Sequence, residues 1–197
     1  MATDWLLEEY KAVWNFYIRT IESRENVIDF YFKTIAIPTG IIVALTAMFR
    51  VGIFGTDLIQ PASDTQSFYM DACGVLLLFV FLIGFGIFLY YSKETRVSLT
   101  YRRYLGEIIE KAKASNTELR VIDLNPMATG VSQTKTVLFR AAFLRISPIV
   151  LINSGVLGLG FFAFLVEGSL DTATIAAFAA AIGSVVAHAW VFYADNH

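Results

Sequence analysis

The stretch at residues 173–194, ATIAAFAAAIGSVVAHAWVFYA, decides how this chain folds. It runs for about 22 residues without Lys, Arg, Asp or Glu, enough to cross a bilayer at roughly 1.5 Å per residue. Ala176, Ala180, Ser184 and His188 recur at intervals of four, which predicts a stripe of small side chains on one face. Small residues let a second membrane helix approach closely, so we expect the rest of the chain to supply the partners.

The composition is that of a membrane protein. Hydrophobic residues make up 56% of the 197 and charged residues 16%, whereas soluble domains carry about 25% charged residues. A net charge of −2 argues against nucleic-acid binding, and no nucleic-acid partner is expected. The single Cys73 excludes an internal disulfide and a cysteine-based zinc site. Metalloprotease, hydrolase and phosphate-loop motifs are absent, so we expect no enzyme and no catalytic, cofactor-binding or metal-binding residue.

Hydropathy and helical spacing predict an all-α integral membrane protein with four transmembrane helices. A cytoplasmic amphipathic helix precedes the first span, and a cytoplasmic helical module, ending in a basic interfacial elbow, follows the second. Both of these segments extend their spans as helices. The expected boundaries are 1–30 for the amphipathic helix, 31–54, 68–91, 146–166 and 172–194 for the spans, and 92–145 for the module.

Basic residues predict the orientation. Of the 15 Lys and Arg residues, four lie in residues 1–33 and ten in residues 92–145. The 51–71 and 167–171 loops and the C-terminus carry none. By the positive-inside rule both termini and the long connection are cytoplasmic.

The amphipathic helix carries more acidic than basic residues, which favours packing against protein over lying on a lipid surface. Its apolar face is interrupted by Arg24. The apolar positions at helical spacing are Leu6, Tyr10, Val13, Tyr17, Ile21, Ile28 and Tyr31.

Asn153 and His188 form the most specific candidate site, an intramembrane polar pair. Each lies about six or seven residues from the cytoplasmic end of its span, so both are roughly 10 Å below the inner surface. A short hairpin makes their helices antiparallel neighbours, and a contact is feasible. One interpretation is a polar gate that titrates near neutral pH. The other is an interhelical hydrogen bond that only holds the bundle together, contributing about 0.6–2 kcal/mol.

Small residues in the first, third and fourth spans predict faces for helix packing, and Pro38 in the first span predicts a hinge. A ring of such groups at one depth indicates either a constriction or ordinary close packing. The predicted packing residues are Ala36, Gly40, Ala44, Gly155, Gly158, Ala176, Ala180 and Ser184.

Basic residues near the membrane ends predict binding of an anionic lipid headgroup or another anionic ligand. The alternative is that they only set the topology and attract anionic lipid weakly, at about 1 kcal/mol each. These residues are Lys93, Arg96, Arg102, Arg103, Arg140 and Arg145.

These patterns lead to two functional hypotheses. The first is a non-enzymatic oligomeric membrane protein that forms or gates a membrane pathway, controlled by its cytoplasmic helical module. The second is a structural or anchoring subunit of a membrane complex that recruits a cytoplasmic protein without conducting. The layout is similar to that of small bacterial membrane effectors of stress or phage-defence systems, which implies a bacterial inner (plasma) membrane. The expected partners are the lipid bilayer and further copies of the chain or other subunits.

Overall fold

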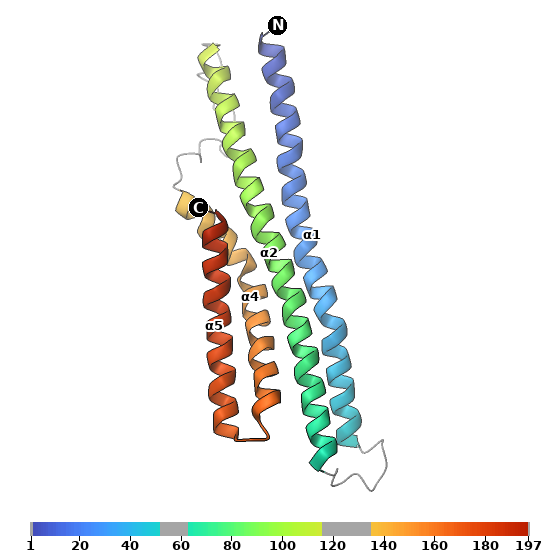
Figure 1. The fold of residues 1–197 in the computed structure, drawn as a ribbon. Helices are drawn as coiled ribbons and strands as arrows, with labels where there is room; N and C mark the ends of the chain where they lie inside the picture. The colour runs from blue at the N-terminus through green and yellow to red at the C-terminus, as the bar shows by residue number, and fades with distance from the viewer. Residues whose placement is uncertain (1, 52–62, 116–134, 197) are drawn as a thin grey trace. The chain divides into compact units, whose positions relative to one another are not determined.

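The computed structural model describes residues 2–51, 63–115 and 135–196, which are helical apart from one turn. In this part of the chain four helices follow one another (Figure 1). They are α1 (Ala2–Val51), α2 (Ser63–Ser115), α4 (Lys135–Leu165) and α5 (Leu170–Asn196). The predicted all-α class is confirmed for these residues.

The first two helices are longer than a membrane requires. α1 has 50 residues and α2 has 53. At 1.5 Å per residue each measures about 75–80 Å, against about 30 Å for the hydrocarbon core of a bilayer. α2 is continuous, so residues 92–115 prolong the predicted second span as a helix. Pro38 lies inside α1 without ending it, and its role as a hinge stays a prediction.

Three segments of the described residues are long and apolar enough to cross a membrane. They are Tyr69–Ala114, Ala141–Leu165 and Leu170–Ala194, which contain most of the predicted second, third and fourth spans. The predicted first span, 31–54, runs past Ile42, the last residue of α1 whose side chain is described, so it stays a prediction. The orientation of the spans also stays a prediction.

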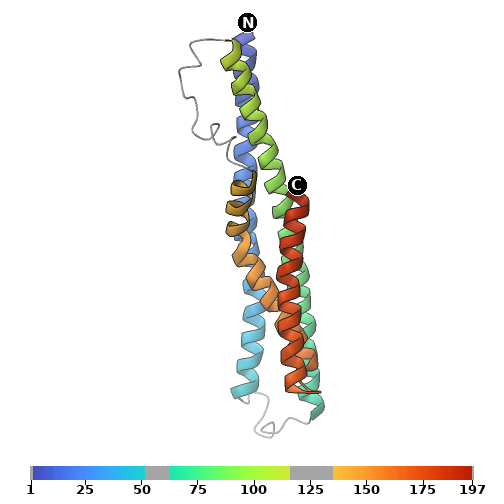
Figure 2. The ribbon, with the colours of Figure 1, turned by 90° about the vertical axis from the view of Figure 1, so that its left-hand side faces the viewer.

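A tight turn at residues 166–169 joins α4 to α5. The Ser169 carbonyl accepts a hydrogen bond from the Ala173 amide at 2.9 Å, and its hydroxyl oxygen accepts one from the Thr172 amide at 3.5 Å. Serine is a favoured residue at this position because it satisfies amides that the first helical turn leaves unpaired. The turn makes α4 and α5 antiparallel neighbours (Figures 1 and 2).

The chain divides into two compact units. The first, here called the hairpin unit, comprises Met1–Val27, Tyr90–Arg145 and Phe192–His197. The second, here called the bundle unit, comprises Ile28–Leu89 and Ile146–Val191.

The hairpin unit has an apolar core between α1 and α2. Buried Val13 packs with buried Leu105 and Ile108. The Tyr104 hydroxyl donates a hydrogen bond to the Glu9 carboxylate at 2.9 Å. The amphipathic helix therefore packs against protein, as its acidic balance predicts. Partly buried residues around this core are Leu6, Tyr10, Trp14, Tyr17 and Tyr101.

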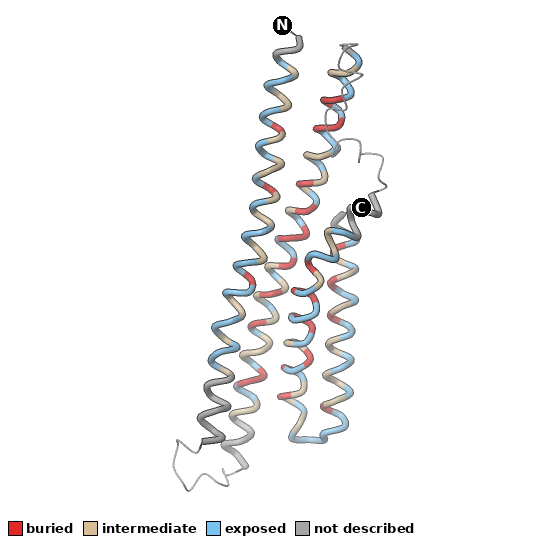
Figure 3. Tube along the Cα trace, turned by 180° about the vertical axis from the view of Figure 1, so that it is seen from behind, coloured by how far each residue is buried: buried red, intermediate tan, exposed pale blue. Residues whose placement is uncertain are grey.

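The bundle unit exposes large apolar side chains and buries a few polar ones within an apolar interior. Large side chains such as Phe79, Leu151 and Phe178 are exposed, while Asn153 and His188 are wholly buried. Buried positions alternate with exposed ones along each helix (Figure 3). Only 17% to 39% of the most apolar windows of the three candidate spans is buried within the chain. Such an outer surface suits contact with a lipid bilayer, because lipid tails solvate apolar side chains.

Candidate functional site

The hairpin of α4 and α5 brings Asn153 and His188 into contact inside the bundle unit. The Asn153 Nδ2 atom lies 3.3 Å from the His188 Nε2 atom, and both side chains are wholly buried. The contact that the sequence made feasible is therefore present, while its role in function stays a prediction.

The contacts of His188 identify its neutral tautomer. Its Nδ1 atom lies 2.7 Å from the backbone carbonyl oxygen of Ser184, which can only accept a hydrogen bond, so Nδ1 carries the proton. In a neutral imidazole Nε2 is then an acceptor, and it receives the hydrogen bond from the Asn153 amide. Ser154 extends the network, because its hydroxyl donates to the Ser184 hydroxyl at 3.0 Å.

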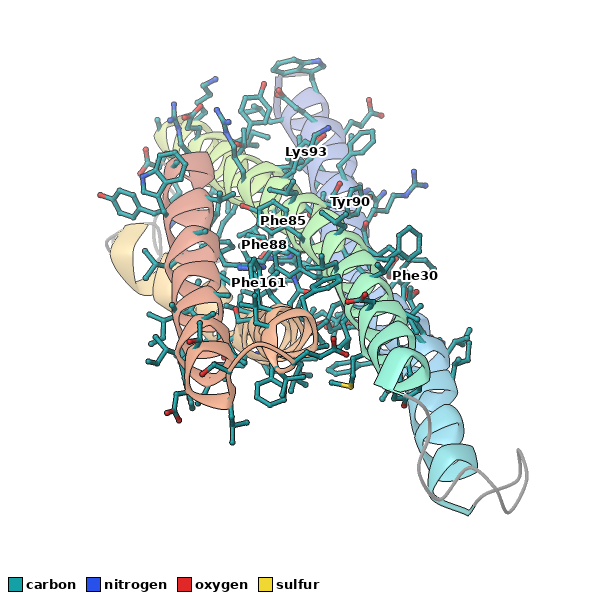
Figure 4. All side chains as sticks on the ribbon, turned by 60° about the horizontal axis from the view of Figure 1, so that its bottom comes forward. Phe30, Phe85, Phe88, Tyr90, Lys93 and Phe161 are labelled. Atoms are coloured by element: carbon teal, nitrogen blue, oxygen red, sulfur yellow. The ribbon has the colours of Figure 1, made fainter. Side chains whose placement is uncertain are left out.

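Three phenylalanines of α2 surround the imidazole ring. The ring centroids of Phe81, Phe85 and Phe88 lie 6.3, 5.0 and 4.6 Å from that of His188, all in edge-to-face geometry. Figure 4 shows Phe85 and Phe88 in the interior between helices, with Phe30 on the outer side. The rings enclose the polar network in apolar surroundings, where each hydrogen bond is electrostatically stronger than in water.

Gly84 makes room for the Asn153 side chain. A Cβ atom added at Gly84 would overlap the Asn153 Oδ1 atom and lie 3.1 Å from Cε2 of Tyr31. The oxygen therefore lies along a Cα–H bond of Gly84, a weak hydrogen-bond geometry that recurs between packed helices. This matters because Asn153 Oδ1 is buried without a conventional hydrogen-bond partner among the described residues.

Tyr31 connects α1 to the same region. Its side chain is wholly buried, and its hydroxyl donates to the backbone carbonyl of Ile149 at 3.3 Å. The sequence placed Tyr31 on an apolar face but did not connect it with Asn153. The 4-3 spacing of Phe81, Phe85 and Phe88 on one helical face, with Gly84 between them, is the signal that could have identified the enclosure.

The close approach of α4 to α5 falls at Gly158. An added Cβ atom there would lie 2.8 Å from the backbone oxygen of Ala177 and 3.2 Å from Cβ of Ala181. The contact residues of α5 are thus each one position beyond the predicted Ala176 and Ala180, which are half-buried.

Helix geometry explains this offset. A strict interval of four residues advances about 40° around the helix at each step, so a long four-residue stripe winds off one face. The buried positions of α5 instead mix intervals of four and three. They are Ala173, Ser184, His188 and Phe192, with the half-buried Ala177 and Ala181 against Gly158.

Three other predicted packing residues are open to the surroundings in the described part of the chain. Ala36 is exposed, and a Cβ atom added at Gly40 or Gly155 would meet no atom within 4 Å. A packing role for these three residues would need a partner outside the described residues. The side chain of Ala44 lies outside the described residues, so its packing role stays a prediction.

The predicted anion-binding residues lie mainly on the surface. Arg103 forms an exposed ion pair with Glu107 at 3.1 Å, and Arg102 is half-buried. The side chain of Arg140 lies outside the described residues. The remaining three, Lys93, Arg96 and Arg145, are exposed.

Among the described residues, no three His, Cys, Asp or Glu side chains group as a metal site requires. The chain matches no protein-family model, no curated protein and no solved structure. Its class therefore rests on its own features: an all-α protein with candidate membrane spans and a buried polar network in its bundle unit.

Proposed function

We propose that this protein is a non-enzymatic oligomeric membrane protein that forms or gates a pathway across a bacterial inner membrane, with both termini in the cytoplasm. The observation that carries the proposal is the wholly buried His188, hydrogen-bonded to Asn153 and Ser184 within candidate spans. Ionisable side chains inside membrane helices are rare and usually mark ion pathways, proton relays or gates.

A histidine at this position can change its charge, which a purely structural polar residue cannot do. Asn153, Ser154 and Ser184 could hold the two helices together by neutral hydrogen bonds. Histidine is the side chain whose charge ordinarily changes near neutral pH, and a charge at the centre of a span costs about 3 kcal/mol. Protonation of His188 would also put a second N–H donor against the donor group of Asn153. Both effects favour a rearranged bundle.

Among the described residues, no carboxylate forms an ion pair with His188. α2 contributes the rings of Phe81, Phe85 and Phe88, and α4 contributes the neutral Asn153. From α1, the titratable group packed near Asn153 is the neutral phenol Tyr31. Charge gained by His188 would thus be balanced by rearrangement rather than by an ion pair.

Exposed glycines on the bundle unit support the oligomeric part of the proposal. A Cβ atom added at Gly40, Gly155 or Gly183 would meet nothing within 4 Å. Glycine costs stability within a helix relative to alanine, and in membranes it is enriched where helices approach closely. These faces suit contacts with further copies of the chain.

Flux through liposomes tests the proposal. The purified oligomer is reconstituted and ion release is measured between pH 5 and 8, for the wild type, His188→Ala and Asn153→Ala. Val186→Ala is the matched control, because Val186 is exposed on the same helix. We expect both polar-pair variants to change the flux or its pH dependence and the control to leave it unaltered. Absence of flux from a verified oligomer at every pH would refute the proposal.

A second candidate function is favoured by the surface of the hairpin unit. Trp5, Leu7 and Phe16 of α1 are each at least half exposed, outside the candidate spans. Large exposed apolar side chains commonly mark protein interaction sites. An anchoring subunit would bind a cytoplasmic partner there and conduct nothing. Loss of a co-purified partner from Trp5→Ala/Phe16→Ala, together with absence of flux, would support this alternative.

A further inference from the structure

Arg24 occupies an inward-facing position in the hairpin unit. In the sequence it interrupts the apolar face of the first helix. In the structure its side chain is half-buried, and its Nε atom is buried without a hydrogen-bond partner among the described residues. A guanidinium is always charged and has five N–H donors, so burying part of it without an acceptor is unfavourable. We therefore expect a hydrogen-bond acceptor to bind beside the Arg24 guanidinium group.

A second arginine converges on the same place. The charges of Arg24 from α1 and Arg145 from α4 both act on the hydroxyl of Tyr91 from α2. Tyr91 is almost wholly buried. Beside it, the Ser23 hydroxyl lies 3.3 Å from the Tyr90 hydroxyl and holds α1 against α2. Two positive charges from different helices thus lie close enough to one buried phenol to act on it electrostatically.

Among the residues whose side chains the structure describes (5–42, 69–114 and 141–194), no ion pair joins either arginine to a carboxylate. The ion pairs found in these residues are exposed and join other groups, Lys33 with Asp29 and Arg103 with Glu107. The face of α2 that begins at Tyr91 is polar as well as buried. It continues with Thr95 and Ser98, at helical intervals of four and three.

The sequence places this region at the level of lipid headgroups. Tyr91 is the last residue of the predicted second span, and Arg145 directly precedes the predicted third span. Tyr90 and Tyr193, both in the hairpin unit, are about half exposed. Exposed tyrosines and arginines at span ends are typical of the membrane interface, where phosphate oxygens are the abundant acceptors.

We propose that Arg24 and Arg145 together bind a phosphoryl group beside Tyr91. The planar guanidinium fork matches phosphate oxygens and binds them through charge-assisted hydrogen bonds. The phosphoryl group belongs either to an anionic phospholipid or to a free phosphate. Of the basic residues that the sequence predicts for anion binding, Arg145 takes part in this site, and Arg24 is new.

Binding to the purified full chain in neutral detergent tests the site. Native mass spectrometry measures the affinity for phosphatidylglycerol, with phosphatidylcholine as the lipid without net charge. A thermal-shift titration measures binding of inorganic phosphate. Arg24→Gln and Arg145→Gln are compared with a matched control, Arg19→Gln. Arg19 is an exposed arginine on α1, the helix that carries Arg24.

We expect each of Arg24→Gln and Arg145→Gln to weaken phosphatidylglycerol binding about fivefold, as the loss of one interfacial arginine contact implies. The control should bind as the wild type does. A parallel loss of inorganic phosphate binding would identify a site for the phosphoryl group in any source, whereas loss for the lipid alone would identify a lipid site. Since Arg145 is exposed, its substitution should leave folding intact.

The proposal is overturned if both variants bind phosphatidylglycerol as tightly as the wild type. It is also overturned if Arg19→Gln weakens binding equally, because diffuse surface charge would then account for the affinity. Equal binding of phosphatidylcholine would likewise overturn the assignment to an anionic phospholipid, because both lipids carry a phosphodiester and differ in the net charge of the headgroup. These readouts do not depend on whether the protein conducts.

Discussion

Replacing Gly84 by alanine would place a methyl group where the Asn153 carboxamide lies. The new Cβ atom would overlap Asn153 Oδ1 and lie 2.8 Å from its Cγ and 3.1 Å from Cε2 of Tyr31. Asn153 and Tyr31 are wholly buried, so neither side chain has free space into which to move. The substitution should therefore displace Asn153 and break its hydrogen bond to His188.

The expected cost follows from these contacts. Overpacking a filled interior costs about 1–3 kcal/mol, and an interhelical hydrogen bond in a membrane protein contributes about 0.6 kcal/mol. We expect Gly84→Ala to lower the free energy of unfolding by about 2–3 kcal/mol. Gly86→Ala is the matched control two residues away, since a Cβ atom there would meet nothing within 4 Å. Alanine also favours the helix by up to about 1 kcal/mol, so the control should be neutral or stabilising.

Unfolding by sodium dodecyl sulfate in mixed micelles, followed by circular dichroism, measures the difference between the two variants. The double variant Gly84→Ala/Asn153→Ala removes the overlapped carboxamide and should be more stable than the sum of the two single effects implies. Equal unfolding midpoints for Gly84→Ala and Gly86→Ala would refute the reasoning, because the overlap would then carry no energetic cost.

Three further predictions concern other parts of the molecule. Gly158→Ala should destabilise the fold by about 1–3 kcal/mol in the same unfolding assay, because its methyl group would lie 2.8 Å from a backbone oxygen of α5, whereas the control Gly86→Ala should not. The hydrogen bond to Glu9 and the charge of that carboxylate raise the pKa of Tyr104. The contribution of this hydrogen bond to stability is therefore present below the ordinary tyrosine pKa. It is lost as the pH rises through the raised pKa. Glu9→Gln should lower the pH at which the Tyr104 phenol ionises, measured by ultraviolet absorbance in comparison with the variant Tyr104→Phe. A cysteine placed at Asn116 should react with a membrane-impermeant thiol reagent only from the cytoplasmic side; labelling from outside would reverse the predicted orientation.

Contacts between helices that are joined by a short turn could be predicted from the sequence. Counting 1.5 Å per residue from the cytoplasmic ends of the two spans placed Asn153 and His188 at one depth, and their side chains lie 3.3 Å apart. The same count did not identify the face of α5 that meets Gly158. That face depends on the rotation of the helix, and a strict four-residue interval does not stay on one face along the helix.

Contacts between helices that are distant in sequence were not predictable in the same way. Gly84 and Tyr31 meet Asn153 because of the relative register of α1, α2 and α4, which no short connection fixes. Arg24 was visible only as a break in an apolar face. A charged residue on such a face is an anomaly whose meaning depends on what packs beside it, here Tyr91 and Arg145.

The two proposed sites differ in the charge that stabilises them. The His188 network is satisfied when its members are neutral, so a gain of charge disturbs it. A guanidinium group does not lose its charge in proteins, so the pair of Arg24 and Arg145 is stabilised by the arrival of an anion. A change in proton concentration should act on the first site, and a change in phosphoryl ligand on the second.

Flux measured in vesicles with and without phosphatidylglycerol, for wild type, His188→Ala and Arg145→Gln, therefore separates the effects of the two sites. If the sites are independent, Arg145→Gln abolishes the lipid effect and keeps the pH effect, and His188→Ala does the reverse. Loss of both effects in either variant would show that the sites are energetically coupled.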